Sequence, residues 1–224
     1  MEQYKKDFID FMVRSKALTF GDFVTKSGRR TPFFINTGSY SAGSQLAQLG
    51  RCYAEALCQN LPDGFDVLFG PAYKGIPLAA AASIALSAHY SRDVSFCFNR
   101  KEAKDHGEGG VTVGHKLRAG DRVVIIEDVV TAGTSVRESV PLISSHAGAK
   151  VVGLAVSVDR MERGTGSASA LAELKEEFGI AAFSIVNIDE IVEYLHNREI
   201  DGAVVLDDAV KGRIDEYRRE YGCR

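Results

Sequence analysis

Apolar side chains near the N-terminus recur at the spacing of an amphipathic helix. Within residues 4–13, three of them follow the first at offsets of four, seven and eight residues, so all four share one helix face. These residues are Tyr4, Phe8, Phe11 and Met12. Residues 20–24 have an extended pattern, residues 26–32 are rich in turn formers and residues 33–35 are apolar, which together predict a hairpin.

Beyond the hairpin, apolar runs of strand length alternate with segments of helical periodicity. Leu46, Leu49, Tyr53 and Leu57 mark a second helix. We expect strands at residues 65–69, 94–98, 123–126, 151–158 and 182–186. The runs between residues 123 and 158 are almost unbroken, as in strands that are covered on both faces. The alternation predicts an α/β fold with a central, mostly parallel sheet flanked by helices.

The length and composition fit one globular domain over residues 1–224. The chain is 45% hydrophobic and 25% charged, which are average values for such proteins. No internal repeat, linker or low-complexity tract interrupts it. Helices are expected between residues 187 and 224, beginning at caps such as Asn187 with Glu190.

Charge and cysteine usage narrow the class of protein. The formal net charge of −3 disfavours nucleic-acid binding, which needs a basic face. Apolar stretches such as residues 76–82 are too short to span a bilayer, and residues 1–6 lack a signal-peptide core. The four cysteines show no metal-ligand spacing, so they indicate free thiols in a reducing compartment. We expect a cytoplasmic protein without membrane or nucleic-acid partners.

The strongest functional signal is a strand that ends in two acids and a turn of small residues. The apolar run 123–126 leads into Glu127 and Asp128, and a helix should follow. The turn itself consists of Val129, Val130, Thr131, Ala132, Gly133, Thr134 and Ser135. Ligands of open α/β sheets bind at the carboxyl ends of strands, where a helix N-terminus offers N–H groups to a phosphate. The two acids would repel that phosphate unless they accept hydrogen bonds from a sugar diol or face a cation.

Two other features concern the same turn. It matches neither a Walker sequence nor Gly-x-Gly-x-x-Gly, which disfavours nucleoside triphosphates and dinucleotides. The following helix carries conflicting signals, because Ser135 and Glu138 have capping-box spacing while Pro141 predicts a kink or a later start. A generic strand, turn and helix with exposed acids is the plain alternative.

A charged, glycine-rich segment occupies residues 99–110. It contains three basic residues, three acidic residues and three glycines. A mobile loop that binds a multiply charged ligand such as pyrophosphate would carry this pattern, because charge-assisted bonds must offset an ordering cost of about 1–2 kcal/mol per residue. A solvated surface loop is the alternative. Tyr73 and Lys74 follow another strand end, at the same expected edge of the sheet.

The segment 123–135 resembles the motif with which type I phosphoribosyltransferases bind phosphoribosyl pyrophosphate (PRPP), and residues 99–110 resemble the mobile catalytic loop of the orotate phosphoribosyltransferases. The resemblance runs from the N-terminal helix to Arg163 and fades after about residue 165. It implies the type I phosphoribosyltransferase fold, with a small N-terminal hood of about residues 1–40 over the base and a mobile catalytic loop.

The resemblance also implies roles for single residues. Catalytic roles fall on Lys104, His106 and Asp128. The residues expected to bind PRPP are Lys26, Tyr73, Lys74, Arg100, Lys101, Lys104, His106 and the stretch from Glu127 through Ser135. The residues expected to bind orotate are Lys26, Phe34, Ile35, Thr131 and Arg160. Ile35 departs from the family, which usually has an aromatic residue there.

The activity implied by the resemblance is transfer of ribose 5-phosphate from PRPP to orotate, giving orotidine 5′-monophosphate and pyrophosphate in UMP biosynthesis. Mg²⁺ would be carried by PRPP, without direct protein ligands. A homodimer with shared active sites is expected. Two alternatives stay open: a phosphoribosyltransferase for a purine or for uracil, against which Lys26, Phe34 and Arg160 argue, and a PRPP-sensing regulator, which should carry a basic face and no lysine loop.

Overall fold

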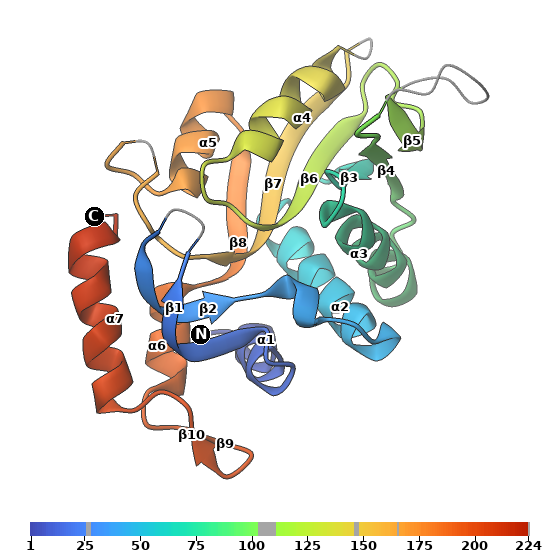
Figure 1. Ribbon diagram of the computed structural model, residues 1–224. Coiled ribbons are helices and arrows are strands. Elements are labelled where there is room, and N and C mark those ends of the chain that lie inside the picture. The colour runs from blue at the N-terminus through green and yellow to red at the C-terminus, as the bar shows by residue number, and fades with distance from the viewer. Residues whose placement is uncertain (26–27, 103–110, 146–147, 165, 224) are drawn as a thin grey trace.

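The computed structural model describes residues 1–25, 28–102, 111–145, 148–164 and 166–223. Its centre is a six-stranded sheet with the order β5-β4-β3-β6-β7-β8 (Figure 1). The strands are β3 (Val67–Phe69), β4 (Ser95–Asn99), β5 (Thr112–Gly114), β6 (Arg122–Val129), β7 (Lys150–Asp159) and β8 (Ala181–Asn187). The pairs β4–β3, β3–β6, β6–β7 and β7–β8 are parallel, and β5 is antiparallel to β4. The expected α/β fold and its five core strands are confirmed.

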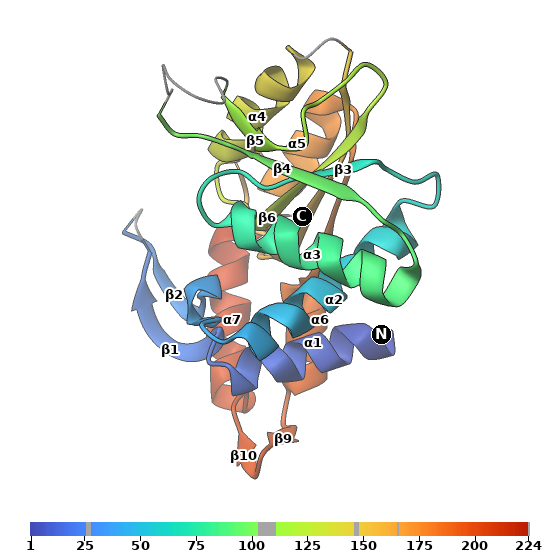
Figure 2. The ribbon, with the colours of Figure 1, turned by 90° about the vertical axis from the view of Figure 1, so that its right-hand side faces the viewer.

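Helices cover both faces of this sheet (Figure 2). On one face lie α1 (Gln3–Arg14), α2 (Gly43–Asn60) and α3 (Gly75–Tyr90), and on the other lie α4 (Thr134–Ser144) and α5 (Ala170–Phe178). Successive residues of β6 alternate between the two cores: Ile126 packs with the first group of helices and Ile125 with the second. Burial on both faces explains the unbroken apolar run in β6.

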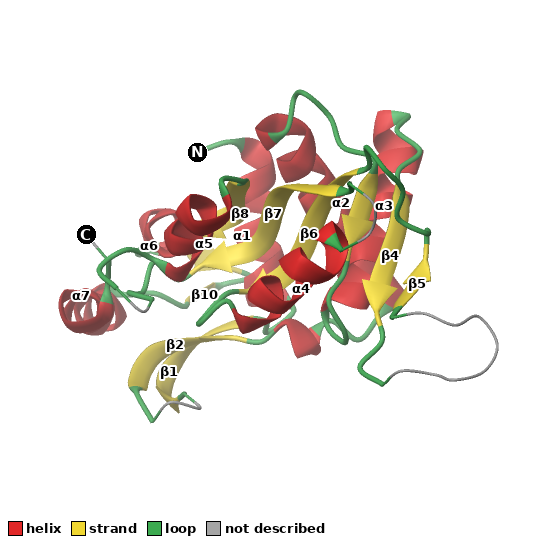
Figure 3. Cartoon of the chain, turned by 90° about the horizontal axis from the view of Figure 1, so that it is seen from above, coloured by secondary structure: helices red, strands yellow, loops and turns green. Residues whose placement is uncertain are grey.

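The N-terminal elements agree with the sequence pattern. Phe8, Phe11 and Met12 of α1 are buried, and Tyr4 packs partly against the same core. The strands β1 (Leu18–Val24) and β2 (Arg30–Ile35) form the expected antiparallel hairpin. This hairpin lies apart from the central sheet, beside the C-terminal helix α7 (Asp208–Tyr221) (Figure 3).

The chain after β8 contains elements that were only partly foreseen. Asn187 and Glu190 form the expected capping box of α6 (Ile188–Leu195). Two strands of two residues each, β9 (Glu199–Ile200) and β10 (Ala203–Val204), then form a small hairpin. Strands this short show no detectable alternation of apolar and polar residues. The three-residue strand β5 was not predicted for the same reason. No helix within the described ranges is long and apolar enough to cross a bilayer.

The start of α4 corrects one expectation. Ser135 is not the N-cap of a capping box, because the helix already begins at Thr134 and its N-cap is Gly133, with φ of +72° and no side-chain capping bond. Glycine tolerates this left-handed conformation, so the chain turns into the helix earlier than the capping pattern suggested. Pro141 lies within the helix and does not delay its start.

Candidate active site

Loops from neighbouring parallel strands converge at the carboxyl edge of the sheet. Residues 70–74 follow β3, residues 130–135 follow β6, and Arg160 follows β7 directly. Since β3, β6 and β7 are adjacent and parallel, their ends lie at one edge, where ligands of open α/β sheets bind. The Nζ atom of Lys74 lies 2.8 Å from Oδ2 of Asp128, which joins the first two loops directly.

The turn after β6 is accessible from solvent. Thr131, Ala132 and Thr134 are exposed and Ser135 is half-buried, while Gly133 is buried. A Cβ atom at Gly133 would lie 2.9 Å from Nη1 of Arg137 and 3.0 Å from Leu174, so glycine is needed for space as well as for its backbone angle. The first N–H groups of α4 have no partner within the helix, so the turn presents donors and a positive dipole end to an anion.

The two acids at the end of β6 point to opposite faces of the strand, as alternation requires. Glu127 faces α4, and it is buried. Burial raises the pKa of its carboxyl group, while a hydrogen bond from Ser135 acts in the opposite direction. Asp128 faces Lys74 and the segment after β2. Only Asp128 therefore extends the site toward the loop at residues 70–75.

Buried hydroxyl groups fix the backbone that carries these acids. Tyr53 donates to the carbonyl oxygen of Glu127 at 2.6 Å, and Ser157 donates to that of Asp128 at 2.6 Å. Burial raises the pKa of Tyr53 well above its ordinary value, so its phenol stays protonated and remains a donor. The acid pair is thus attached to α2 and β7, and its position is rigid.

The loop at residues 70–75 is held close to β6. A Cβ atom at Gly75 would lie 2.8 Å from the carbonyl oxygen of Ile126, and the backbone N–H of Ala72 donates to Asn99 at 2.8 Å. The Ala72–Tyr73 peptide bond is cis. Tyr73 is 70% exposed, and Nζ of Lys101 lies 5.8 Å from the centre of its ring.

Residues 99–110 are named the cationic segment for their basic residues Arg100, Lys101 and Lys104, and the segment is described only at its two ends. The backbone N–H of Arg100 donates to the carbonyl oxygen of Val111 at 2.8 Å, which brings the ends together beside β4 and β5. Lys101 is exposed and close to Tyr73. Lys104 and His106 lie outside the described residues, and so does Lys26.

The residues expected at the base lie on the β1–β2 hairpin and at the ends of β6 and β7, and their surroundings differ. Phe34 is 39% exposed and stacks on Phe23, with ring centres 5.4 Å apart. Ile35 packs partly against the core, on the opposite face of β2, so it could contact a base bound beside Phe34 only through its backbone.

Arg160 is neither free nor at the surface. Its side chain is 10% exposed, its Nη2 atom lies 2.6 Å from Glu162, and its guanidinium group lies 4.3 Å from the centre of the Phe33 ring. Thr31 of β2 also contacts it, with Oγ1 3.3 Å from Nη2. Arg160 therefore connects the end of β7 to the hairpin that carries Phe34.

Two residues near this edge were missed by sequence reasoning. Thr37 donates to Asp128 at 2.7 Å across 91 positions of the sequence, a separation that no local pattern reveals. Arg137 donates to the carbonyl oxygen of Ala132 and pairs with Glu177 at 2.7 Å. Its place one helical turn after Gly133 could have suggested that it supports the turn.

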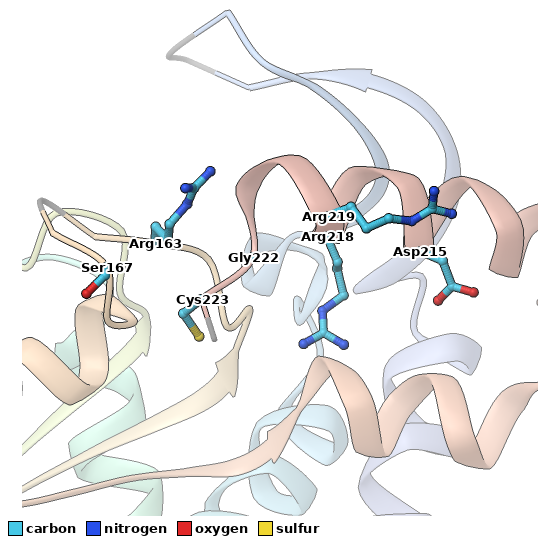
Figure 4. A pocket seen from close by; sticks show the side chains of 7 residues that line it. All are labelled: Arg163, Ser167, Asp215, Arg218, Arg219, Gly222 and Cys223. Carbon is cyan, nitrogen blue, oxygen red and sulfur yellow. The ribbon is translucent and has the colours of Figure 1, made fainter.

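A depression of about 820 Å³ lies at the C-terminal end of α7 (Figure 4). It is lined by Arg163, Ser167, Asp215, Arg218, Arg219, Gly222 and Cys223. Its charged groups are partly engaged, because Arg218 pairs with Asp189 and Arg163 donates to the carbonyl oxygen of Glu220. It contains neither the small-residue turn nor Lys74, so we place the candidate site at the sheet edge.

The fold and the turn at its edge match a known class of protein. A family model described as "Phosphoribosyl transferase domain" matches residues 36–176, more than half of the chain. The match includes the loop after β3, the cationic segment and the turn after β6. It thus covers the convergent loops described above.

Relatives that match the whole chain indicate which family of phosphoribosyltransferases it resembles. The orotate phosphoribosyltransferases of Clostridium beijerinckii and Clostridium acetobutylicum are each 58% identical to the chain over 224 residues, covering 100% of both sequences. The crystal structure of orotate phosphoribosyltransferase from Francisella tularensis has a TM-score of 0.83 and 36% identity, covering 96% of this chain and 99% of that one. The chain belongs to the orotate phosphoribosyltransferase family. The motifs alone suggested that the similarity fades near residue 165. The relatives instead match the chain along its whole given length.

Gly133→Ala should weaken the turn in two measurable ways. The left-handed backbone costs a residue with a Cβ about 1–2 kcal/mol, so the melting temperature should fall by several degrees. Displacement of the turn should also weaken ribose 5-phosphate binding, by about five- to thirty-fold if a similar energy is lost. Calorimetry would measure both quantities.

Gly179→Ala is the matched control. Gly179 also has a positive φ, +62°, but a Cβ there meets nothing within 4 Å and the residue caps the far end of α5. This variant should lose stability without losing affinity. Equal affinity losses in both variants would show that the turn has no special relation to the ligand.

Proposed function

We propose that the chain transfers the ribose 5-phosphate group of PRPP to orotate, giving orotidine 5′-monophosphate and pyrophosphate in pyrimidine biosynthesis. Full-length relatives at 58% identity carry the name of this enzyme. The observation that carries the proposal is the contact between Lys74 and Asp128, 2.8 Å apart beside the exposed turn after β6. One small ligand with a phosphate, a diol and a pyrophosphate could engage all three features at once.

The parts of PRPP correspond to distinct parts of this edge. The backbone N–H groups and hydroxyls of residues 129–135 suit the 5-phosphate. Asp128 suits the ribose diol, because a carboxylate accepts hydrogen bonds from hydroxyl groups. Tyr73 and Lys74 suit the pyrophosphate, together with the cations Arg100, Lys101, Lys104 and His106. Lys26 would contact both substrates.

Orotate would lie under the β1–β2 hairpin. Phe34 offers an exposed ring surface, and Arg160 provides a cation at the end of β7. Thr131 of the turn and the backbone of Ile35 would complete the contacts. The Glu162 carboxylate now neutralises Arg160, so the anionic base would have to share this guanidinium group with Glu162.

The chemistry we propose is displacement at the anomeric carbon. The bond from this carbon to pyrophosphate breaks while a bond to the ring nitrogen of orotate forms, through a transition state with oxocarbenium character. The proton on that nitrogen is released to solvent or to the departing pyrophosphate. The chain would act by holding both substrates in line and by neutralising the charge that develops on the leaving group. Lys104 and His106 of the cationic segment, with Asp128 at the ribose, would carry these roles.

We propose that Mg²⁺ enters with PRPP, bound to its phosphate oxygens. In the part of the chain that the structure describes, no group of three or more His, Cys, Asp or Glu side chains could hold a metal ion. Asp128 already accepts hydrogen bonds from Lys74 and Thr37, which fits a carboxylate that serves the sugar. When bound, Mg²⁺ would supply positive charge to the departing pyrophosphate.

A homodimer would explain an unusual feature of α3. From Gly75 to Tyr90 this helix contains no Asp, Glu, Lys or Arg, and helices that are apolar all round are usually covered on all sides. Yet Ile84 is 70% exposed, and Phe96 on the neighbouring β4 is 38% exposed. We propose that a second copy of the chain covers this surface, close to the cationic segment that it would share.

We also propose a cytoplasmic location. The four cysteines are all free thiols, and Cys52 and Cys97 are buried. Unpaired cysteines suit a reducing compartment such as the cytoplasm.

The activity is tested by mixing protein, PRPP, Mg²⁺ and orotate and recording the orotate absorbance. We expect the absorbance to fall with time and pyrophosphate to accumulate. A parallel panel with uracil, adenine, hypoxanthine and guanine should give little or no product. Turnover of one of those bases in place of orotate would reassign the substrate, and PRPP binding without turnover of any base would favour a regulator.

Lys104→Ala should lower turnover by roughly 10²–10³-fold, the effect of losing one donor to a transition-state charge. The Michaelis constant for orotate should change little, since the proposed contact is to the leaving group. Steady-state kinetics with both substrates would measure this. Lys175→Ala, in α5, controls for the loss of one positive charge, and full activity in the Lys104 variant would remove Lys104 from the mechanism.

Ile84→Asp should convert the dimer to a monomer, because an unpaired carboxylate in an apolar interface costs several kcal/mol. Val204→Asp is the control, since Val204 is also exposed, at 44%, but lies in the β9–β10 hairpin. Sedimentation of the two variants and the parent chain would report their masses. A dimeric Ile84→Asp variant would place the interface elsewhere, and a monomeric parent chain would contradict the homodimer.

A further inference from the structure

Thr37 lies in a short turn that is firmly attached to the N-terminal elements. The turn is the 3-10 helix η1 (Thr37–Ser39), and it follows β2. Its N-cap Asn36 accepts a hydrogen bond from Gly38 at 3.1 Å, and the backbone N–H of Asn36 donates to Ala17 at 2.7 Å. The Ser39 hydroxyl contacts the carbonyl oxygen of Lys16 at 3.3 Å. The backbone of Thr37 is therefore fixed independently of the central sheet.

From this turn, the Thr37 hydroxyl reaches the acid at the end of β6. It donates to Oδ2 of Asp128 at 2.7 Å, and the same oxygen accepts from Lys74 at 2.8 Å. The other oxygen, Oδ1, accepts from the backbone N–H of Val129 at 2.8 Å. Both carboxylate oxygens are thus engaged, and three donors determine how the group is turned.

The donors differ in how well they can hold this orientation. The Lys74 side chain is 63% exposed, and an ion pair with so much solvent contact is weak and easily exchanged. Thr37 is β-branched, so its rotamer is restricted, and two hydrogen bonds attach its turn to residues 16 and 17. Thr37 and the backbone of Val129 therefore set the orientation of Asp128, and Lys74 is the partner that can leave.

The number of acceptor sites on Asp128 explains why it matters that Lys74 can leave while Thr37 stays. A carboxylate has about four lone-pair sites. Thr37 and Val129 use two of them, which leaves two for the two hydroxyls of a ribose diol, provided that Lys74 moves away. Pyrophosphate is the ligand group that would draw Lys74 from Asp128.

We propose that Thr37 is a positioning residue that keeps Asp128 turned toward the ribose diol of PRPP when Lys74 transfers to the pyrophosphate. The inference rests on the proposed function and extends it to a residue outside the PRPP motif. Because Thr37 comes two residues after β2, it also links the hairpin that carries Phe34 to the ribose site.

The test compares PRPP binding, by calorimetry with Mg²⁺ present, in the parent chain and in Thr37→Val and Thr37→Ser. Valine keeps the shape and removes the donor, so affinity should fall about ten-fold or more, as expected for a lost hydrogen bond to a charged group. Serine keeps the donor and should stay within about two-fold of the parent. Ser41→Ala, which removes an exposed hydroxyl four residues further along the chain and outside the turn, should bind as the parent does.

A double-mutant cycle separates positioning from a general structural effect. In an Asp128→Ala background, Thr37→Val should cause no further loss of PRPP affinity, because Thr37 acts through that carboxylate. Melting temperatures of all variants would identify any that are unfolded, and the serine variant keeps the test valid if valine is not tolerated. An equal effect of valine in both backgrounds, or none in the parent, would overturn the inference. Failure of the parent chain itself to bind PRPP would instead overturn the proposed function.

Discussion

The site depends on a single carboxylate whose backbone is buried and whose side chain accepts hydrogen bonds from two distant segments of the chain. Asp128 ends a strand that is covered on both faces, and its carbonyl oxygen is bonded to Ser157 of β7. Its side chain accepts from Lys74 after β3 and from Thr37 after β2. A charge in this position is stable because every oxygen has a donor. Those donors also bring together the elements that the proposed reaction needs.

The residues around the site fall into two groups: those held by buried contacts, and exposed side chains that can change partners. The acid pair is attached through Tyr53 and Ser157 to buried elements, and close backbone contact at Gly75 holds the loop after β3 against β6. In contrast, Lys74 and Tyr73 are largely exposed. A phosphoryl ligand would meet a fixed acceptor and a fixed turn, with cations that can move to it. That division suits catalysis by positioning and charge neutralisation.

The second face of β6 shows why two adjacent acids need not share a role. Glu127 faces α4, where burial raises the pKa of its carboxyl group and Ser135 donates to it. Asp128 points to the opposite face of the strand and pairs with Lys74. The two acids of the motif differ because strand geometry places them in different surroundings.

Much of the fold followed from the sequence because it rests on local periodicity. The alternation of apolar runs predicted the parallel sheet and its five core strands, the stripe from Phe8 to Met12 predicted α1, and residues 123–135 marked the turn at the sheet edge.

Contacts between residues far apart in the sequence could not be predicted in this way. The hydrogen bond from Thr37 to Asp128 and the packing of Arg160 on Phe33 depend on how separate elements meet. The start of α4 at Thr134 likewise depended on the left-handed backbone angle of its N-cap Gly133, which the capping-box spacing of Ser135 and Glu138 did not reveal. The sequence by itself determined which segments become strands and which chemistry lies at their ends, because those properties are local. Only the tertiary structure decided which donors hold the carboxylate, because hydrogen bonds across the fold require distances that the order of residues does not contain.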